Sequence, residues 1–339
     1  MTMIGGAGRA GRMVCGVVSG VLGIITMVGV AARLLPSGMS TLPYAANVVA
    51  ATPWFAVAAV PALLFAVLGR RRVMTALMVV CLVLLTYWQA PFYAGMLPRG
   101  SSSQTAGGAD GSSQTLRVMT CNVYKGRADA AQIVRLVRDR HVKVLAMQET
   151  TDEFVRRLDA AGIARYLPYA KTASADGVYG NGVWSAMPLR DTVRDEVQSS
   201  ASQMPAGTVT LGDGKTLRFV SVHTTSPVNG YWRQWKRSLD ELAAMRSHTG
   251  STYVFMGDFN ATYDHAPFRD FLGDRFTDAA RSAGHGLTPT WPADRKGVPL
   301  MFGIDHIVMD RGVGADDVTT SRVAGSDHAA LLATLHVDE

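Results

Sequence analysis

The chain has 339 residues, 48% of them hydrophobic, and a formal net charge of +6. That charge belongs to residues 1–115, which hold seven arginines and one carboxylate, whereas residues 116–339 hold 26 basic and 26 acidic side chains. The balanced second part lacks the bulk basic surface typical of duplex-binding proteins, so nucleic acid is a disfavoured partner. Its single cysteine, Cys121, excludes a disulfide within it.

Three stretches of the first part carry no charge, at residues 13–32, 47–68 and 73–93. Because a helix needs roughly 20 apolar residues to cross a bilayer, each is long enough to span a membrane. Residues 1–97 are therefore predicted to form a three-helix transmembrane region, with the second helix bent at its prolines. A cleaved signal peptide is the alternative for the first stretch, since Arg9 and Arg12 precede it.

Arginines predict the orientation of these helices. Arg9 and Arg12 precede the first helix, and Arg70–Arg72 fill the short turn between the second and the third. By the positive-inside rule both groups face the cytoplasm. We therefore expect a multi-pass protein of the cell membrane, with a cytoplasmic N-terminus and everything after the third helix on the extracellular side. Residues 98–115, rich in Gly and Ser, are predicted to be a flexible linker.

Residues 116–339 are predicted to form a domain in which strands and helices are mixed. Apolar runs with short alternation indicate strands, and apolar residues at helical spacing indicate amphipathic helices. The predicted strands are 116–123, 142–149, 182–187, 216–224, 252–260, 303–310 and 329–337, and the predicted helices are 128–140, 232–245 and 266–272. This order favours an α/β domain with helices layered on sheet.

Polar residues able to do chemistry gather at the ends of these strands, where loops on a rigid sheet often carry a site. They are Asn122, Glu149, His223, Asp258, Asn260, Asp305, Asp327 and His328. Hydrolysis of a phosphate ester needs oxygen ligands for a hard cation, a group that orients or deprotonates water, and donors for the developing charge. These eight residues include oxygen ligands, candidate bases and hydrogen-bond donors, so they supply each kind of group that the reaction needs.

These residues stand in MTCNV, AMQE, VSVHT, MGDFN, GIDHI and GSDHAAL. In this order, over about residues 116–337, the motifs resemble those of the endonuclease/exonuclease/phosphatase superfamily, which is DNase I-like. The resemblance implies a four-layer sandwich of two β-sheets flanked by helices, here preceded by the three-helix anchor. One departure is Ala186 in GNGVWSAMPL, where a basic residue often follows the serine, so a phosphate contact is missing or supplied elsewhere.

The resemblance also implies a role for each residue. Asn122, Glu149 and Asp327 would hold Mg²⁺, for which Mn²⁺ can substitute. Asp258 would align the attacking water, and Asn260 would support Asp258 and the phosphate. His328 would bind or protonate the phosphate, with Asp305 fixing its tautomer, and His223 would be a second donor. The resemblance thus implies a catalytic set of five residues: His223, Asp258, Asn260, Asp305 and His328.

Some of these positions have structural alternatives. Glu149 is also suitable as a helix-start carboxylate for residues 151–158, and Asp305 could pair with its neighbour His306. Asn181 is a candidate substrate contact or an ordinary loop residue. Arg233 and Arg237, in YWRQWKR, suit an anionic head group or the membrane interface. The alternative for that segment is a helix with its tryptophans in the core and its arginines in solvent.

The sequence predicts a metal-dependent phosphoesterase acting on a phosphate or pyrophosphate ester of a lipid-linked cell-envelope substrate, such as undecaprenyl pyrophosphate. A membrane anchor favours a membrane lipid as partner, and no protein partner is implied. The three spans joined to this domain resemble VanJ-type proteins of glycopeptide (teicoplanin) resistance. The alternatives are an extracellular membrane-tethered nuclease, a sphingomyelinase-like phosphodiesterase, or a binding protein without turnover.

Overall fold

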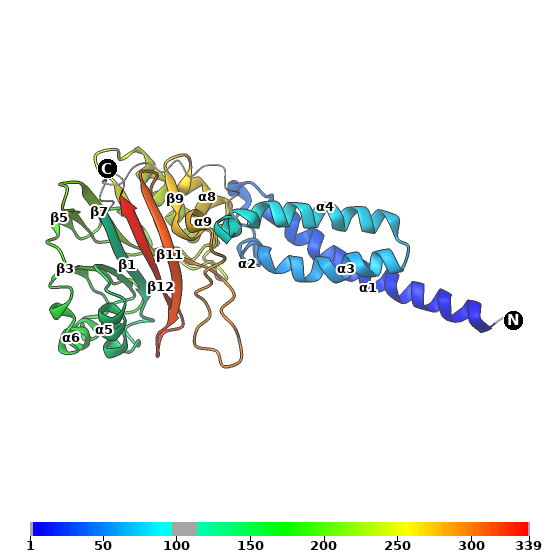
Figure 1. Cartoon of the computed structure of the whole chain (residues 1–339), viewed down its shortest axis with the longest axis horizontal. Helices are drawn as coiled ribbons and strands as arrows, with labels where there is room; N and C mark the ends of the chain where they lie inside the picture. The colour runs from blue at the N-terminus through cyan, green and yellow to red at the C-terminus, as the bar shows by residue number, and fades with distance from the viewer. Residues whose placement is uncertain (1–2, 97–113, 338–339) are drawn as a thin grey trace. The chain divides into compact units, whose positions relative to one another are not determined.

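The computed structural model of the chain describes residues 3–96 and 114–337, with side chains from residue 10 onward (Figure 1). Residues 97–113, which hold most of the linker predicted at 98–115, lie outside the described part, and residues 114 and 115 belong to the first strand of the chain. The chain forms two compact units. The helical unit comprises Met1–Pro91 together with Asp264–Ala266, and the sheet unit comprises Phe92–Tyr263 together with Pro267–Glu339.

The helical unit consists of four α-helices and short 3-10 turns over its described residues. They are α1 (Met3–Arg33), η1 (Ser37–Met39), α2 (Ala45–Ala50), η2 (Thr52–Trp54), α3 (Phe55–Leu68) and α4 (Arg72–Gln89), followed by η3 (Ala90–Met96). Two stretches, Ala10–Arg33 and Arg72–Met96, are long and apolar enough to cross a membrane, by length and composition alone. The apolar stretch between them, Thr52–Leu68, is shorter.

The predicted helix at 47–68 is therefore interrupted. α2 ends at Ala50, and Pro53 lies within the 3-10 turn that precedes α3. Proline suits the first turn of a helix because its missing N–H would be unsatisfied there anyway. Pro61, by contrast, lies inside α3 and does not end it. The prediction of three full-length spans thus becomes two long apolar helices and one short one.

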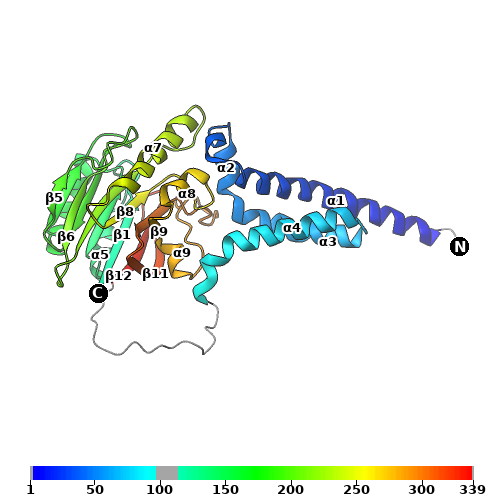
Figure 2. The same ribbon diagram turned by 90° about the horizontal axis from the view of Figure 1, so that it is seen from above.

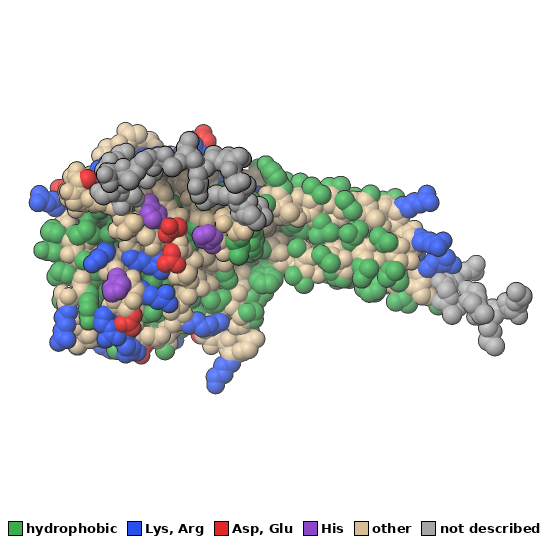
Figure 3. Space-filling view, in the orientation of Figure 1, with side chains coloured by type: hydrophobic (Ala, Val, Ile, Leu, Met, Phe, Trp, Pro, Cys, Tyr) green, Lys and Arg blue, Asp and Glu red, His purple; other side chains and the backbone are tan. Residues whose placement is uncertain are grey.

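Small residues allow the helices of this unit to pack closely. Ala59, Ala62 and Ala66 of α3 are completely buried. A Cβ at Gly29 of α1 would lie 2.2 Å from the Phe55 ring, so only glycine fits at that contact. Close approach through small residues is typical of helix packing in membranes. The outer faces remain apolar, and Figure 3 shows hydrophobic side chains spread over the visible surface of these helices.

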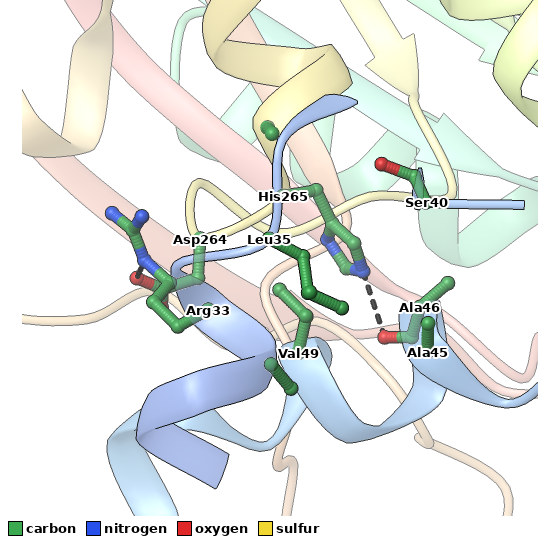
Figure 4. Close-up of a pocket in the computed structure, with 10 residues that line it drawn as sticks. Arg33, Leu35, Ser40, Ala45, Ala46, Val49, Asp264 and His265 are labelled. Carbon is green, nitrogen blue, oxygen red and sulfur yellow. Dashed lines mark hydrogen bonds and ion pairs between the residues drawn. The ribbon is translucent and has the colours of Figure 1, made fainter. Parts of the chain in front are cut away.

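A buried polar cluster stands where α1 ends (Figure 4). Arg33 Nε donates to Asp264 Oδ1 at 2.7 Å, and Gln89 Nε2 donates to Asp264 Oδ2 at 3.1 Å. The ring Nε2 of His265 is hydrogen-bonded to the Ala46 carbonyl at 2.8 Å. The cavity beside them measures about 10 Å³, which is room for one water at most. The cluster therefore satisfies buried polar groups and offers no substrate site.

The sheet unit contains two six-stranded mixed sheets. The first has the order β11-β12-β1-β2-β4-β3 and the second β5-β6-β7-β8-β10-β9. Figure 2 shows strands and helices of this unit from above. The strands are β1 (Gln114–Asn122), β2 (Val144–Gln148), β3 (Tyr169–Ala173), β4 (Asn181–Ser185), β5 (Arg190–Val193), β6 (Ala206–Thr210), β7 (Thr216–His223), β8 (Tyr253–Asp258), β9 (Phe276–Asp278), β10 (Asp305–Asp310), β11 (Val313–Arg322) and β12 (Ala329–Val337). In each sheet one central pair is parallel, β1 with β2 and β7 with β8.

Helices cover the outer faces of the two sheets, so this unit is an α/β fold. They are α5 (Ala130–Asp139), α6 (Asp152–Ala160), η4 (Ile163–Arg165), α7 (Trp232–Ala244), η5 (Met245–Ser247), α8 (Ala266–Leu272) and α9 (Ala279–Ala283). Asp129 and Thr151 start α5 and α6 by accepting a backbone N–H three residues on. The core between the sheets is aliphatic, with Val144, Val254 and Ile307 among its buried members.

Strand register gathers the polar residues at one end of each sheet. In the first sheet Asn122 is opposite Gln148, and Gln148 is opposite Asn181. In the second sheet His223 is opposite Asp258, and Asp258 is opposite Asp305. Because residues opposite each other in adjacent strands have neighbouring side chains, each row is set by pairing alone. Asn122 Nδ2 joins the two rows by donating to Asp258 Oδ2 at 3.1 Å.

His306 forms a buried ion pair away from these rows. Its Nδ1 lies 2.8 Å from Asp278 Oδ2, and its Nε2 lies 2.8 Å from the Ala261 carbonyl. Burial alone lowers the pKa of His306, but the hydrogen bond and the charge of Asp278 outweigh it and raise the pKa above its usual value. His306 is thus paired with Asp278 and not with its neighbour Asp305.

This pair makes stability depend on pH. A protonated His306 stabilises the fold fully below the unfolded-state histidine pKa of about 6.5, and the gain is lost as pH rises through the higher folded-state pKa. We expect the melting temperature of the full chain to fall more steeply above about pH 6.5 than that of His306→Gln. Thermal unfolding in detergent at a series of pH values measures this, and parallel curves for the two proteins would contradict it.

Candidate active site

Two carboxylates and two polar side chains meet where β1, β2, β7 and β8 end. Asn122 Nδ2 lies 3.2 Å from Glu149 Oε1 and donates to Asp258. His223 Nε2 is 3.8 Å from Glu149 Oε1 and 3.7 Å from Asp258 Oδ2. All four residues are buried. The rows of the two sheets therefore converge on one centre, although they come from strands more than a hundred residues apart.

His328 joins this centre from the loop before β12. Its Nδ1 lies 2.7 Å from Asp305 Oδ2, and its Nε2 lies 3.6 Å from Asp258 Oδ2. Asp305 therefore determines which imidazole nitrogen faces the centre, as an acid partner does for many functional histidines. Ser326 supports the loop, since its hydroxyl donates to the Asn122 carbonyl at 2.6 Å and accepts from the His328 N–H at 3.0 Å.

Burial and charge shift the pKa values of these groups in useful directions. Burial raises the pKa of Asp258 to about 6, with His328 opposing that rise. Burial by itself lowers the pKa of His328, but Asp305 and Asp258 outweigh it and raise the pKa to about 10. Near neutral pH, Asp258 is thus a carboxylate close to its proton-accepting range and His328 is a cation. Strongly shifted groups in one cluster are typical of functional sites.

Asp327 lies close enough to Glu149 for the two carboxylates to interact electrostatically. Burial is the first cause that raises the pKa of Asp327, and the charge of Glu149 adds to it. Among the described residues its Oδ1 is buried and has no hydrogen-bond partner. Two carboxylates, one open acceptor and the neighbouring Asn122 amide form a donor set that fits a hard divalent cation.

Asp258, Asp305 and His328 also place three possible ligand atoms within 4.8 Å of one another. This second group is buried, and two of its side chains are already bonded to each other, because His328 Nδ1 lies 2.7 Å from Asp305 Oδ2. We therefore interpret this group as a hydrogen-bonded acid–histidine arrangement.

Asn260 supports the centre mainly through its backbone. Its N–H donates to Asp258 Oδ1 at 2.8 Å, from a left-handed conformation with φ 46°. Its side chain holds the loop after β7, because Nδ2 donates to the Thr224 carbonyl and Oδ1 accepts from the Ser226 hydroxyl, both at 3.0 Å. The predicted contact of the Asn260 side chain with phosphate thus competes with these two bonds.

The three predicted substrate contacts, Asn181, Arg233 and Arg237, differ in burial and in their hydrogen-bond partners. Asn181 is buried, and its amide donates to Ser202 Oγ at 3.0 Å and to the Gln203 carbonyl at 2.6 Å. Arg233 is exposed on the first turn of α7. Arg237 is exposed as well, and its Nε pairs with Glu241 one turn along the same helix, at 3.0 Å. A salt bridge between helix positions four apart orients the guanidinium along α7.

The alternative that places the tryptophans of YWRQWKR in the core holds for Trp235, which is buried in α7 and donates its Nε1–H to the Asn260 carbonyl at 2.9 Å. The sequence did not single out two residues that adjoin the centre. Tyr124 and Lys125 follow Asn122 and have φ angles of 46° and 54°. Glu149 itself has φ 58°. Left-handed backbone at bulky residues is strained and concentrates at functional sites, but no residue-type signal in the sequence announces it.

Solved structures with the same fold include an endonuclease/exonuclease/phosphatase family protein from Bacteroides thetaiotaomicron. It has 14% identity and a TM-score of 0.55, with 68% of this chain and all of that chain covered. TDP2 of D. rerio in complex with a single-strand DNA product has 18% identity and a TM-score of 0.55, with 66% and 99% covered. A conserved protein of unknown function from Enterococcus faecalis has 17% identity and a TM-score of 0.55, with 66% and 100% covered.

No curated protein matches the sequence. The family comparison is more informative, because the endonuclease/exonuclease/phosphatase family matches residues 119–328, which is more than half of the chain. The match begins in β1, which ends at Asn122, and ends on His328, so it includes the whole centre described above. Members of this family are typically hydrolytic phosphoesterases or nucleases. The chain belongs to the endonuclease/exonuclease/phosphatase family.

Proposed function

We propose that this protein is a divalent-metal-dependent phosphoesterase of the cell membrane. The observation that carries the proposal is the convergence of Asp258, His223 and His328 on one point, beside the carboxylates Glu149 and Asp327. Asn122, Glu149 and Asp327 would hold Mg²⁺ or Mn²⁺. When bound, such a cation neutralises phosphate oxygens and polarises the phosphoryl group.

The other residues then have separate tasks. Asp258 accepts a hydrogen bond from the attacking water and takes its proton, for which a pKa of about 6 is well placed. His328, charged and held by Asp305, donates to the phosphate oxygens or to the leaving oxygen. His223 turns its Nε2 to the centre, because its Nδ1–H donates to the Val178 carbonyl at 2.9 Å. In the neutral imidazole Nε2 therefore accepts a hydrogen bond, and it donates to a phosphate oxygen only when the ring is protonated.

The proposed substrate is a lipid-linked phosphate or pyrophosphate of the cell envelope, such as undecaprenyl pyrophosphate. Two apolar helices long enough to cross a bilayer support an enzyme that acts at the membrane, and residues 116–339 carry no net charge that would attract a nucleic-acid backbone. We further propose the VanJ-type assignment and a role in glycopeptide resistance. The cytoplasmic N-terminus and the extracellular sheet unit belong to the same proposal.

A nuclease is the second candidate. The similar fold of TDP2 from D. rerio, solved with a single-strand DNA product, favours it. The experiment compares purified full chain on undecaprenyl pyrophosphate, sphingomyelin, plasmid DNA and bis(p-nitrophenyl) phosphate. Cleavage of the lipid pyrophosphate supports the proposal. Strong DNA cleavage with inert lipids would assign the protein to the nucleases, and a cytoplasmically active reporter fused after Glu339 would contradict the orientation.

Glu149 tests the metal assignment. We expect Glu149→Gln to raise the half-saturating Mg²⁺ concentration by at least about tenfold. The substitution removes the charge of a proposed metal ligand, and the loss of even an outer-shell hydrogen-bond partner lowers metal affinity by about 10- to 100-fold. Chelation should abolish activity in both proteins, and added Mg²⁺ or Mn²⁺ should restore it. Glu196→Gln is the matched control, since Glu196 is a partly buried carboxylate that pairs with Arg218 elsewhere. An unchanged Mg²⁺ requirement in Glu149→Gln would refute this assignment.

A further inference from the structure

The loop between β1 and α5 has an unusual backbone. Tyr124, Lys125 and Gly126 are three consecutive residues in the left-handed region, with φ angles of 46°, 54° and 73°. Glycine adopts this conformation freely, but tyrosine and lysine do so at a conformational cost. Such a run persists only where the surroundings hold it in place.

The loop is held from both sides. The Tyr124 N–H donates to Asn122 Oδ1 and the Lys125 N–H donates to Glu149 Oε2, each at 2.9 Å. On the other side, the Arg157 guanidinium of α6 donates to the Gly126 carbonyl and, at 3.3 Å, to that of Ala128. The backbone of the loop therefore contacts the proposed metal ligands directly, in a fixed conformation.

Close packing at Gly126 fixes the loop further. A Cβ at this position would lie 2.7 Å from Thr151 Oγ1 and 2.9 Å from Phe154 Cβ. Thr151 is the residue that starts α6 by accepting the Phe154 N–H. Only glycine satisfies both the positive φ and this contact, so the loop is preorganised against the first turn of α6.

The loop carries two exposed cations, Lys125 and Arg127. Lys125 Nζ lies 5.9 Å and the Arg127 guanidinium carbon 4.9 Å from the centroid of the Tyr124 ring. Within residues 3–96 and 114–337, neither cation has a carboxylate within ion-pair distance. Most arginines that brace this unit are engaged with acids or carbonyls, as Arg218 is with Glu196. The cations of this loop are thus held in position by an aromatic ring and remain available to an anion.

Arg127 also lines an open hollow of about 460 Å³, together with Arg157, Gly325 and Asp129. Asp129 is the one carboxylate in this group, and its Oδ1 accepts the Gln132 N–H at the start of α5. The hollow is large enough for a substrate group. Two guanidinium groups against one carboxylate favour an anion there, and Arg127 is the cation that can meet it, because Arg157 already donates to the carbonyls of Gly126 and Ala128.

We propose that Lys125 and Arg127 bind the non-scissile phosphate of a diphosphate ester, and so make the enzyme prefer diphosphates to monophosphates. The inference rests on the proposed function. The centre at Asp258 and His328 accommodates one phosphoryl group, and a neighbouring phosphate one bridging oxygen away requires cations of its own. The loop that carries them is bonded to Glu149 through the Lys125 N–H, and Tyr124 is the positioning residue of both cations.

The test compares a prenyl diphosphate with the monophosphate of the same prenyl chain, on full-length protein in detergent micelles. We expect Lys125→Ala and Arg127→Ala each to raise the KM for the diphosphate about tenfold, since one charge-assisted hydrogen bond is lost in each. The KM for the monophosphate should stay within about twofold in both. Arg140→Ala, which removes an exposed cation at the end of α5, is the matched control.

Tyr124 provides an independent readout. Tyr124→Phe should keep the wild-type ratio of the two KM values because the ring is retained, whereas Tyr124→Ala should lower the preference for the diphosphate. A nucleoside diphosphate tested beside the prenyl diphosphate identifies whether the source is soluble or lipid, and both outcomes support a diphosphate site. Equal losses on diphosphate and monophosphate, or no change in KM, would overturn the proposal.

Failure of the proposed function can be distinguished from failure of the loop assignment. If the wild-type chain hydrolyses no phosphate ester, the proposed function is wrong. The binding of methylene diphosphonate, measured by calorimetry, still tests whether the loop holds a diphosphate. Weaker binding by the Lys125→Ala/Arg127→Ala double variant than by wild type then supports the loop assignment. Equal binding by the two proteins refutes it.

Discussion

Asp258→Asn is expected to lower kcat by about 10²–10⁴-fold, the range in which a positioned proton acceptor contributes. The amide keeps the shape of the carboxylate and its place beside His223 and His328, but it cannot take a proton from water. The KM should change less than kcat, because Asp258 acts on the water and not on the bound substrate. Steady-state kinetics on bis(p-nitrophenyl) phosphate at saturating Mg²⁺ measures both constants.

The same substitution should leave stability unchanged or improve it. Burial raises the pKa of Asp258 to about 6, so the folded state bears the cost of a desolvated charge. Asp310→Asn is the control, because Asp310 holds Arg275 at 2.6 Å and the Tyr253 N–H at 2.7 Å away from the centre. It should lower the melting temperature while kcat stays near wild type. Retained activity in Asp258→Asn would sink the assignment of the base.

His328→Gln is expected to lower kcat by about 10²–10⁴-fold, since it removes the cationic donor nearest Asp258. Asp305→Asn should give a smaller loss in the same constant. In that variant the imidazole remains, but the charge that holds its Nδ1 at 2.7 Å and supports its protonation is gone. Measurement of kcat for both variants on the same substrate ranks the two roles.

Asp278→Asn is a matched control for Asp305→Asn. Asp278 also accepts from a buried histidine, at 2.8 Å from His306 Nδ1, but this pair lies outside the centre. We expect Asp278→Asn to reduce the melting temperature and to leave kcat within about twofold of wild type, because no reacting group depends on it. Equal loss of kcat in the two aspartate variants would mean that Asp305 is a structural residue only.

Most of the central strands could be predicted from the sequence, whereas the edge strands and the interior strand β6 could not. β1, β2, β4, β7, β8, β10 and β12 are buried almost throughout and consist largely of apolar runs, which is the pattern that indicates a strand. The sequence does not indicate β6 (AGTVT) or the strands at the sheet edges, β3, β5, β9 and β11. β5 has the exposed sequence RDTV and β11 the polar sequence VGADDVTTSR. An edge strand is solvated on one side and needs no apolar run.

The sequence also identified which residues are capable of the chemistry, because carboxylates, amides and histidines placed directly after apolar strands have few other uses. It did not determine their partners. From the sequence, Asp305 could pair with its neighbour His306 or with the more distant His328. In the structure Asp305 pairs with His328, and His306 pairs with Asp278. Likewise the residue type of Arg237 did not show that its Nε pairs with Glu241 one turn along α7.

By itself, then, the sequence determined where charge and apolar length lie along the chain, and which polar residues follow the central strands. The tertiary structure decided which of these meet. The physical reason is register: the pairing of β8 with β7 and β10 places Asp258 between His223 and Asp305, and no local pattern encodes a pairing between distant strands. The left-handed loop at Tyr124 and Lys125 is likewise imposed by contacts with Asn122, Glu149 and Arg157 that only the folded chain brings together.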